Sequence, residues 1–171
     1  THADVDHVGI FEDMDTVYLS RKAYENFVRE NKGEKNYREQ NPLHAPYVRI
    51  SKILSGYRPL NLQNARIIGG SVEPLEELYT PIGQVSFGGL CFKAFDAAGG
   101  HVAGEVFSIE ENLSLLVTGD IFVNIKGFSR EQAEFNRLAP YLMTSVDTDP
   151  KLAARERAAL LSLVPEEGRV I

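Results

Sequence analysis

The pattern of hydrophobic and polar positions predicts an alternation of short strands and helices from residue 17 onward. Residues 17–19 form an apolar run that is typical of a short buried strand. Ser20 is then a suitable N-cap for a helix over 21–31. A second helix is predicted over 46–55, and Gly56 ends it. The apolar faces of the two helices consist of Tyr24, Phe27 and Val28 in the first and Tyr47, Ile50, Ile53 and Leu54 in the second.

The remaining apolar stretches are mostly typical of strands. Four of them predict strands, at residues 65–68, 90–95, 105–109 and 113–118. The polar run Glu110-Glu111-Asn112 predicts a hairpin turn between the last two. Residues 169–171 have the composition of one more strand. Strands mixed with helices at this spacing indicate an α/β layered fold.

Prolines, glycines and charges predict the segments that interrupt these elements. Residues 32–42 are highly charged, and we interpret them as a surface excursion. Two prolines in residues 73–82 predict a loop. Ser129 and Pro150 are typical of helix starts, and the helices are predicted over 130–138 and 150–163.

Composition limits the class of protein. The chain has 171 residues, of which 43% are hydrophobic, and this is enough for one domain with one core. The formal net charge of -6 comes from mixed signs without a long basic run, so a nucleic-acid partner is not favoured. No apolar stretch reaches the roughly 20 residues that a membrane span needs, so no membrane partner is expected.

A single cysteine, Cys91, excludes an internal disulfide framework. Its apolar neighbours predict a buried position, where the thiol acts as a small hydrophobic group. Because structural disulfides mark oxidising compartments, we expect a cytoplasmic protein.

Residues that commonly bind metal ions are concentrated at the start of the chain. Two of the four histidines lie in the run His2-Ala3-Asp4-Val5-Asp6-His7. In an extended loop, positions 2, 4 and 6 would project to one side and His7 to the other, so the run would serve two divalent ions. Each ion would still need ligands from distant parts of the sequence.

Two further candidate ligands lie at the edges of predicted strands. His101 follows Gly99-Gly100 just before a strand, and Asp120 follows a strand through Thr118-Gly119. Taken alone, the histidine is also typical of a surface turn and the aspartate of an ordinary strand-ending turn. A carboxylate at a strand end is also suited to bridging two ions. Their combination with the histidine-rich start favours a metal site.

The three motifs resemble those of the metallo-β-lactamase superfamily. T-H-A-D-V-D-H-V-G at residues 1–9 is similar to the signature T-H-x-H-x-D-H-x-G. G-G-H-V-A-G at 99–104 is similar to the turn G-H-T-x-G, and L-L-V-T-G-D at 115–120 is similar to L-x-F-T-G-D. The resemblance implies an α/β fold of the αββα sandwich type over residues 1–171, with a helical insertion around 32–59.

The resemblance also implies a dinuclear site and a reaction. Its ligands would be His2, Asp4 and His101 on the first ion, Asp6 and His7 on the second, and Asp120 bridging both. The implied activity is that of a metal-dependent hydrolase, in which a hydroxide between two divalent ions attacks a small ester, thioester or phosphoester. Asp6 would be the catalytic residue that orients this hydroxide and accepts its proton.

Two departures from the family motifs keep alternatives open. Asp4 stands where the family has a second histidine, and its harder oxygen ligand adds iron or manganese to zinc as candidate metals. A flavodiiron-like oxidoreductase, whose branch has an acidic residue there, is therefore one alternative, and a metal-free scaffold of the same fold is another. The family's strands before the first motif and its last histidine, after a strand such as 169–171, are absent, so we expect a fragment.

The expected partner is a small-molecule substrate. The sequence leaves a homodimer open and does not identify the substrate, because members of such a superfamily share the site and differ in the surrounding loops.

Overall fold

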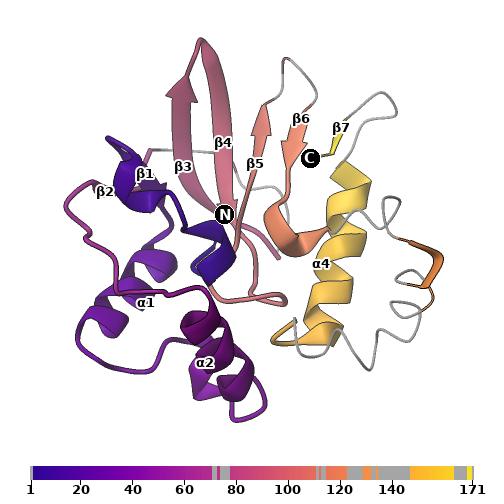
Figure 1. Cartoon of the computed structure of the whole chain (residues 1–171). Helices are drawn as coiled ribbons and strands as arrows, with labels where there is room; N and C mark the ends of the chain where they lie inside the picture. Colours follow the sequence, from indigo (N-terminus) through magenta and orange to yellow (C-terminus); the bar gives the residue numbers. More distant parts are fainter. Residues whose placement is uncertain are drawn as a thin grey trace.

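The structure is a computed structural model, and it describes residues 2–70, 73, 78–110, 112, 115–122, 129–131, 134, 147–163 and 169–170. Its described framework consists of two β-sheets and the helices α1, α2 and α4 (Figure 1).

The smaller sheet pairs β1 (Val17–Leu19) with β2 (Ala65–Ile67) in parallel, and both strands lie where the sequence predicts them. Helix α1 (Arg21–Asn31) follows β1 and has the predicted bounds. Its predicted N-cap is also confirmed, because the Ser20 hydroxyl accepts a 3.1 Å hydrogen bond from the backbone N–H of Ala23.

The larger sheet has the strand order β3-β4-β5-β6-β7. Its strands are β3 (Thr80–Phe87), β4 (Leu90–Asp96), β5 (Val106–Glu110), β6 (Leu115–Val117) and β7 (Arg169–Val170). All neighbours are antiparallel except β6 and β7, which are parallel. Apart from β3, these strands correspond to predicted ones, with residue 111 of the predicted hairpin turn and residues 113–114 of the predicted β6 outside the described residues.

The predicted loop over residues 73–82 is wrong at its end, because β3 begins at Thr80. Pro81 is tolerated there since β3 is an edge strand, and the ladder is irregular between Pro81 and Gly83. Cys91 is exposed on β4 rather than buried, near the turn that joins β4 to β3.

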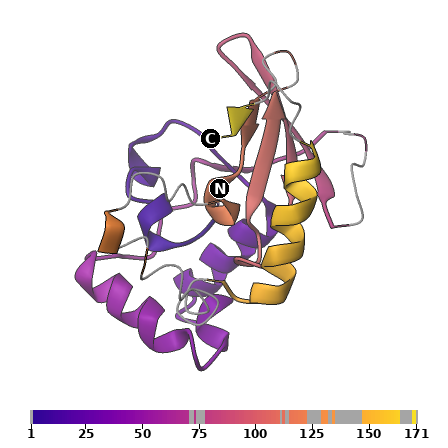
Figure 2. The same ribbon diagram turned by 90° about the vertical axis from the view of Figure 1, so that its right-hand side faces the viewer.

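Strands of both sheets line one cavity. Helix α4 lies against the larger sheet and α1 packs against the smaller one, whereas α2 lies below both sheets in Figure 1 (see also Figure 2). Ala94 and Val106 of the larger sheet line this cavity, whereas the adjacent Phe95 and Phe107 pack against Leu160 of α4 (Pro150–Leu163). Phe27 of α1 packs in a second cluster beside the smaller sheet. The layer order is therefore helix, sheet, sheet, helix.

Helix α4 begins at the predicted Pro150 and ends at the predicted Leu163. The predicted helix over 130–138 lies mostly outside the described residues, and residues 130, 131 and 134 are helical. None of the described helices is long and apolar enough to cross a membrane.

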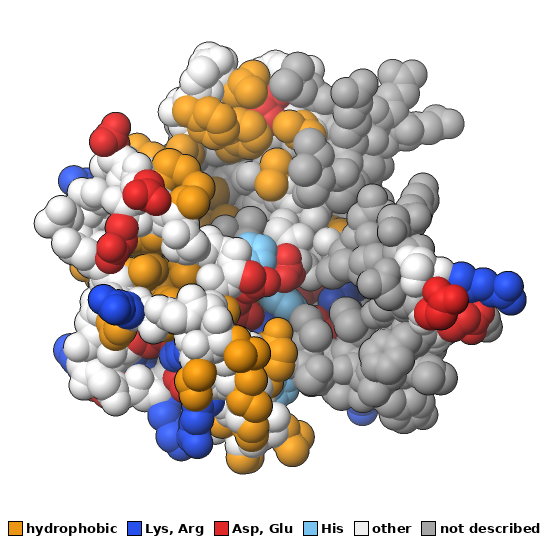
Figure 3. All heavy atoms as spheres, in the orientation of Figure 1, with side chains coloured by type: hydrophobic (Ala, Val, Ile, Leu, Met, Phe, Trp, Pro, Cys, Tyr) orange, Lys and Arg blue, Asp and Glu red, His pale blue; other side chains and the backbone are white. Residues whose placement is uncertain are grey.

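Helix α2 (Ala45–Leu54) exists as predicted, but its predicted buried face is wrong. Ile53 and Leu54 are 71% and 81% exposed. Figure 3 shows hydrophobic side chains gathered over α2 in the lower part of the molecule. The inward side of α2 instead contains Lys52 and the buried Val48, and Lys52 forms ion pairs with Glu30 (2.7 Å) and Glu39 (3.0 Å).

The segment 32–42 is also more buried than a surface excursion would be. It contains a short 3-10 helix, η3 (Arg38–Gln40), and the side chains of Asn36 and Arg38 are buried. Asn36 donates a 2.8 Å hydrogen bond to Glu30 of α1, which anchors the segment to the helix. This anchoring directs Arg38 into the protein interior.

Candidate metal centre

The opening run does not form the extended loop that we predicted from alternation. Val5–His7 forms a 3-10 helix, η1, closed by a 3.0 Å hydrogen bond from the backbone N–H of His7 to the carbonyl of Asp4. The turn brings the rings of His2 and His7 together, with centroids 4.1 Å apart. It also leaves the Asp6 side chain 73% exposed, 3.8 Å from Nε2 of His7.

The two distant candidates meet this run at one edge of the larger sheet. His101 precedes β5, and Asp120 lies in η4 (Gly119–Ile121) directly after β6. Because β5 and β6 are antiparallel neighbours, the start of one lies beside the end of the other. Asp120 consequently lies 3.2 Å from Nε2 of His7 and 3.8 Å from Nε2 of His101. Figure 3 shows histidine and acidic side chains meeting in a hollow near the centre of this face.

Three of these side chains form a group that fits one divalent ion. His2, His7 and Asp120 each offer a donor atom, and the three atoms lie within 4.8 Å of one another. Two imidazole nitrogens and one carboxylate oxygen are a ligand set that zinc, iron and manganese accept. The chemistry of the donors therefore fits the metal that the sequence motifs imply.

A buried carboxylate that the sequence analysis missed orients the first histidine. Glu105 is fully buried, and its Oε2 lies 2.7 Å from Nδ1 of His2. Its Oε1 accepts a 3.3 Å hydrogen bond from the backbone N–H of Asp120. Glu105 thus joins two members of the donor group and engages Nδ1 of His2, so that Nε2 is the ring nitrogen that would bind a metal ion. A charged residue at the edge of an apolar strand was the signal in the sequence.

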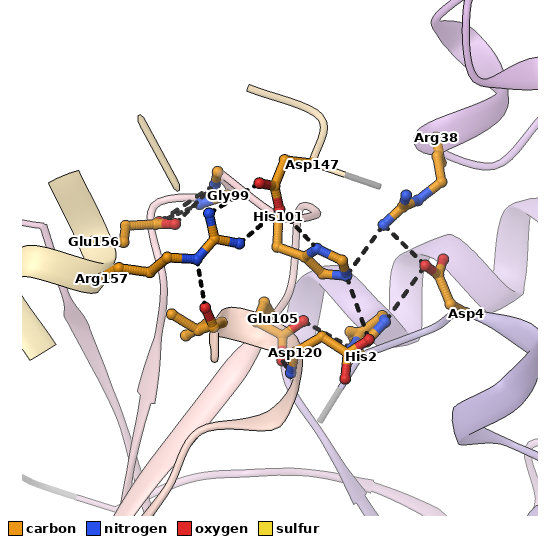
Figure 4. A network of polar contacts seen from close by, with 12 residues as sticks. His2, Asp4, Arg38, Gly99, His101, Glu105, Asp120, Asp147, Glu156 and Arg157 are labelled. Carbon is orange, nitrogen blue, oxygen red and sulfur yellow. Dashed lines mark hydrogen bonds and ion pairs between the residues drawn. The ribbon is translucent and has the colours of Figure 1, made fainter. Parts of the chain in front are cut away.

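A second missed carboxylate orients His101 in the same way (Figure 4). Oδ1 of Asp147 lies 3.1 Å from Nδ1 of His101. Arg157 of α4 holds this carboxylate with two 2.9 Å hydrogen bonds. Glu156, on the same helix, accepts a 2.9 Å hydrogen bond from the backbone N–H of Gly99. Helix α4 therefore fixes both the ring of His101 and the turn that carries it.

Charges in the site shift the pKa values of its members. Burial opposes protonation of His2, but hydrogen bonds to Asp4 and Glu105 and the charges of these groups outweigh burial and raise the pKa of His2 to about 9. The hydrogen bond from His7 lowers the pKa of Asp120 to about 2, against the effect of burial. Burial would raise the pKa of Asp4, but the hydrogen bond from His2 and the charge of Arg38 lower it.

Asp4 contacts an arginine that the sequence analysis placed at the surface. Nη2 of Arg38 lies 2.8 Å from Oδ2 of Asp4 and 3.3 Å from Nε2 of His101 (Figure 4). Asp4 also lies 3.4 Å from Nε2 of His2. Of the six candidates from the sequence, four converge on the donor group or its edge, Asp4 is paired with Arg38, and Asp6 lies at the rim.

Two cavities border the donor group. A small one of about 90 Å³ is lined by Asp6, Asp120 and Tyr47 among others. The cavity between the sheets, of about 330 Å³, is lined by His2 and His7 at one end and mostly by apolar side chains elsewhere. The site is therefore accessible to a polar group on one side and an apolar group on the other.

Comparisons with known proteins bear on the fold. No protein-family model and no curated protein sequence matches the chain. Among solved structures, the crystal structure of BLEG-1 B3 metallo-beta-lactamase matches with a TM-score of 0.50 and 20% sequence identity. The match covers 99% of this chain and 64% of the chain of that structure. The protein therefore spans less than two thirds of the length of the solved structure that it matches. This likeness confirms the predicted α/β metallo-β-lactamase fold, and at 20% identity it concerns the fold alone.

Proposed function

We propose that the chain is a metal-dependent hydrolase that holds a divalent ion at His2, His7 and Asp120 and acts on a small ester, thioester or phosphoester. The observation that carries the proposal is the group of three donor atoms within 4.8 Å of one another, contributed by the opening loop and η4. The buried carboxylate of Glu105, which fixes His2, supports a site built for a metal ion.

The roles of the side chains follow from their positions. A divalent ion, when bound, lowers the pKa of a coordinated water toward 7 and polarises the carbonyl or phosphoryl oxygen. His2 and His7 would hold the ion through neutral nitrogens, and Asp120 would hold it through a negative oxygen. Asp6, exposed at the rim and 3.8 Å from His7, would accept a proton from water and release it to solvent.

The larger cavity supports a substrate with an apolar part. Its lining between the sheets includes Val85, Phe92 and Val106, and it opens onto His2 and His7. An acyl chain or aromatic group of moderate size would bury its surface there and bring the reacting carbon or phosphorus beside the histidines. We therefore expect esters and thioesters with hydrophobic acyl groups to be better substrates than short polar ones.

The experiment is an activity screen of the metal-loaded protein. Chromogenic esters, thioesters and phosphoesters are assayed after loading with Zn²⁺, Mn²⁺ or Fe²⁺ and after chelation. Hydrolysis that requires the metal and falls to background in His7→Ala and Asp120→Asn would support the proposal. The exposed Asp15→Asn is the control and should retain activity. Turnover that is absent with every metal, or unchanged in His7→Ala, would contradict it.

One observation favours a second candidate, a metal-free scaffold of the same fold. The guanidinium of Arg38 already provides a cation for Asp4 and His101. Metal analysis of the purified protein, before and after titration, separates the two candidates. A retained ion supports the hydrolase, and no binding under any condition supports the scaffold.

A further inference from the structure

Beside the proposed metal site, two further potential metal-binding atoms lie on either side of a guanidinium. They are Oδ2 of Asp4 and Nε2 of His101, and Oδ2 of Asp120 lies 3.8 Å from the same nitrogen of His101. Nη2 of Arg38 contacts both atoms, at 2.8 Å from Asp4 and 3.3 Å from His101. The Arg38 side chain is only 2% exposed, so it is a built-in part of this position rather than a surface group resting on it.

The hydrogen bonds of His101 indicate that the guanidinium of Arg38 contacts the lone pair on Nε2 of this ring. Asp147 lies 3.1 Å from Nδ1 of His101, an arrangement in which Nδ1 carries the proton and Nε2 keeps its lone pair. Arginine has only N–H donors, so its contact with Nε2 must use that lone pair. A metal ion at this position would need the same lone pair and the same oxygen of Asp4.

Charge explains why an aspartate stands at position 4. A neutral imidazole there would offer the guanidinium no opposite charge, whereas a carboxylate gives a charge-assisted hydrogen bond of 2.8 Å. Burying the guanidinium without such a partner would be costly. Asp4 and Arg38 therefore act as a pair.

We propose that Arg38 is an internal cation that occupies the metal position at Asp4 and His101, so that the chain binds one divalent ion where the motifs of its sequence imply two. The binding of one ion rests on the function proposed above. The exclusion of a second ion depends only on Arg38, Asp4 and His101.

Metal stoichiometry tests the proposal. The wild-type chain and Arg38→Ala are titrated with Zn²⁺ and Mn²⁺ by calorimetry, and bound metal is measured by mass spectrometry after dialysis. We expect one ion per wild-type chain and two per Arg38→Ala chain. The double variant Arg38→Ala with Asp4→Ala should return to one. Arg155→Ala, which removes an exposed arginine of α4, should stay at one.

The outcomes separate this inference from the proposed function. A gain of one ion in Arg38→Ala supports the inference, whether the wild type binds one ion or none, and a wild type that binds none overturns the proposed function. Two ions in the wild type, or no gain in a folded Arg38→Ala, overturns the inference.

A second variant covers the case in which Arg38→Ala does not fold. Asp4→Asn keeps the shape of the side chain and leaves Arg38 in place. If Asp4 serves Arg38 rather than the metal, the affinity for the single ion should not fall by more than about threefold. A loss of affinity beyond about tenfold, the scale for removal of a group that supports a metal site, would identify Asp4 as part of that ion's site and overturn the inference.

Discussion

Glu105 and Asp147 face the Nδ1 atoms of His2 and His101 at 2.7 and 3.1 Å, and this arrangement determines which nitrogen of each ring is available. With Nδ1 bonded to a carboxylate, Nε2 is directed toward the neighbouring candidate ligands. Both carboxylates are nearly inaccessible to water, which strengthens their effect on the rings.

Replacing Glu105 should weaken metal binding without removing a ligand. Glu105→Gln keeps the size of the side chain but removes the charge that holds His2, and we expect the affinity for Zn²⁺ to fall about 10–100-fold. Titration calorimetry measures the change. Glu110→Gln, a buried glutamate at the other end of β5 that bonds Asn112, is the matched control and should keep wild-type affinity. Equal affinities in both variants would exclude an orienting role for Glu105.

Metal binding should release a proton from His2. The pKa of His2 is raised from its ordinary value of 6.5 to about 9, so the ring is protonated at pH 7.5 in the metal-free protein. This proton stabilises the metal-free fold fully below pH 6.5, and the stabilisation is lost as the pH rises through about 9. A metal ion needs the neutral ring, so its apparent affinity should rise over the same interval.

Calorimetry in buffers of different ionisation enthalpy measures this release. At pH 7.5 we expect close to one proton per bound ion, and fewer in Glu105→Gln, whose His2 has lost a partner that raises its pKa. Binding heats that do not depend on the buffer would contradict the prediction.

At the scale of elements, the sequence predicts best where the signal is local. Ser20 caps α1 through a contact three residues away, and Pro150 begins α4, so both helices have their predicted bounds. The strand β3 was missed because Pro81 is acceptable only at an edge, and an edge is defined by the whole sheet. The predicted buried face of α2 was wrong because the helix turns Val48 and Lys52 inward, where Lys52 pairs with Glu30 and Glu39.

The difference between local signals and contacts of distant residues also explains which residues of the candidate site could be predicted. The motifs that contain His2, His7, His101 and Asp120 are recognisable in the sequence, and the fold brings all four together. Arg38, Glu105 and Asp147 belong to no such motif. Their roles arise from contacts with residues that are far away in the sequence. Composition and periodicity contain no information about such contacts.

Helix α4 controls the turn that carries His101, and Gly100 tests this control. A Cβ at Gly100 would collide with the backbone nitrogen of Ala153 and the carboxylate of Glu156. We expect Gly100→Ala to lower the free energy of unfolding by about 1–3 kcal/mol and to weaken metal binding if the turn shifts. Urea denaturation measures the first effect. Gly9→Ala, where no atom lies within 4 Å of the added Cβ, should change stability by less than about 0.5 kcal/mol. Equal stabilities of the two variants would show that α4 does not constrain the turn.

At the scale of the whole molecule, the donor group joins the two layered halves. His2 and His7 precede the smaller sheet, and Asp120 directly follows β6 of the larger one (Figure 1). Apart from this group, the Ser20 hydroxyl of the α1 cap donates a 3.2 Å hydrogen bond to the carbonyl of Gly104 across the same boundary. An ion at the site would therefore cross-link both halves.

Metal removal should consequently destabilise the chain as a whole. A ligand that binds only the folded state, at a free concentration 100 times its dissociation constant, adds about 2.7 kcal/mol to the free energy of unfolding. For a chain of this length that corresponds to a rise in Tm of about 5–10 °C. Thermal denaturation with Zn²⁺ and with a chelator measures the difference. The variant His7→Ala with Asp120→Asn should show the same Tm under both conditions, because it lacks two of the three donors. A wild-type Tm that does not respond to metal would mean that no ion joins the two halves, and the proposed site would have to be abandoned.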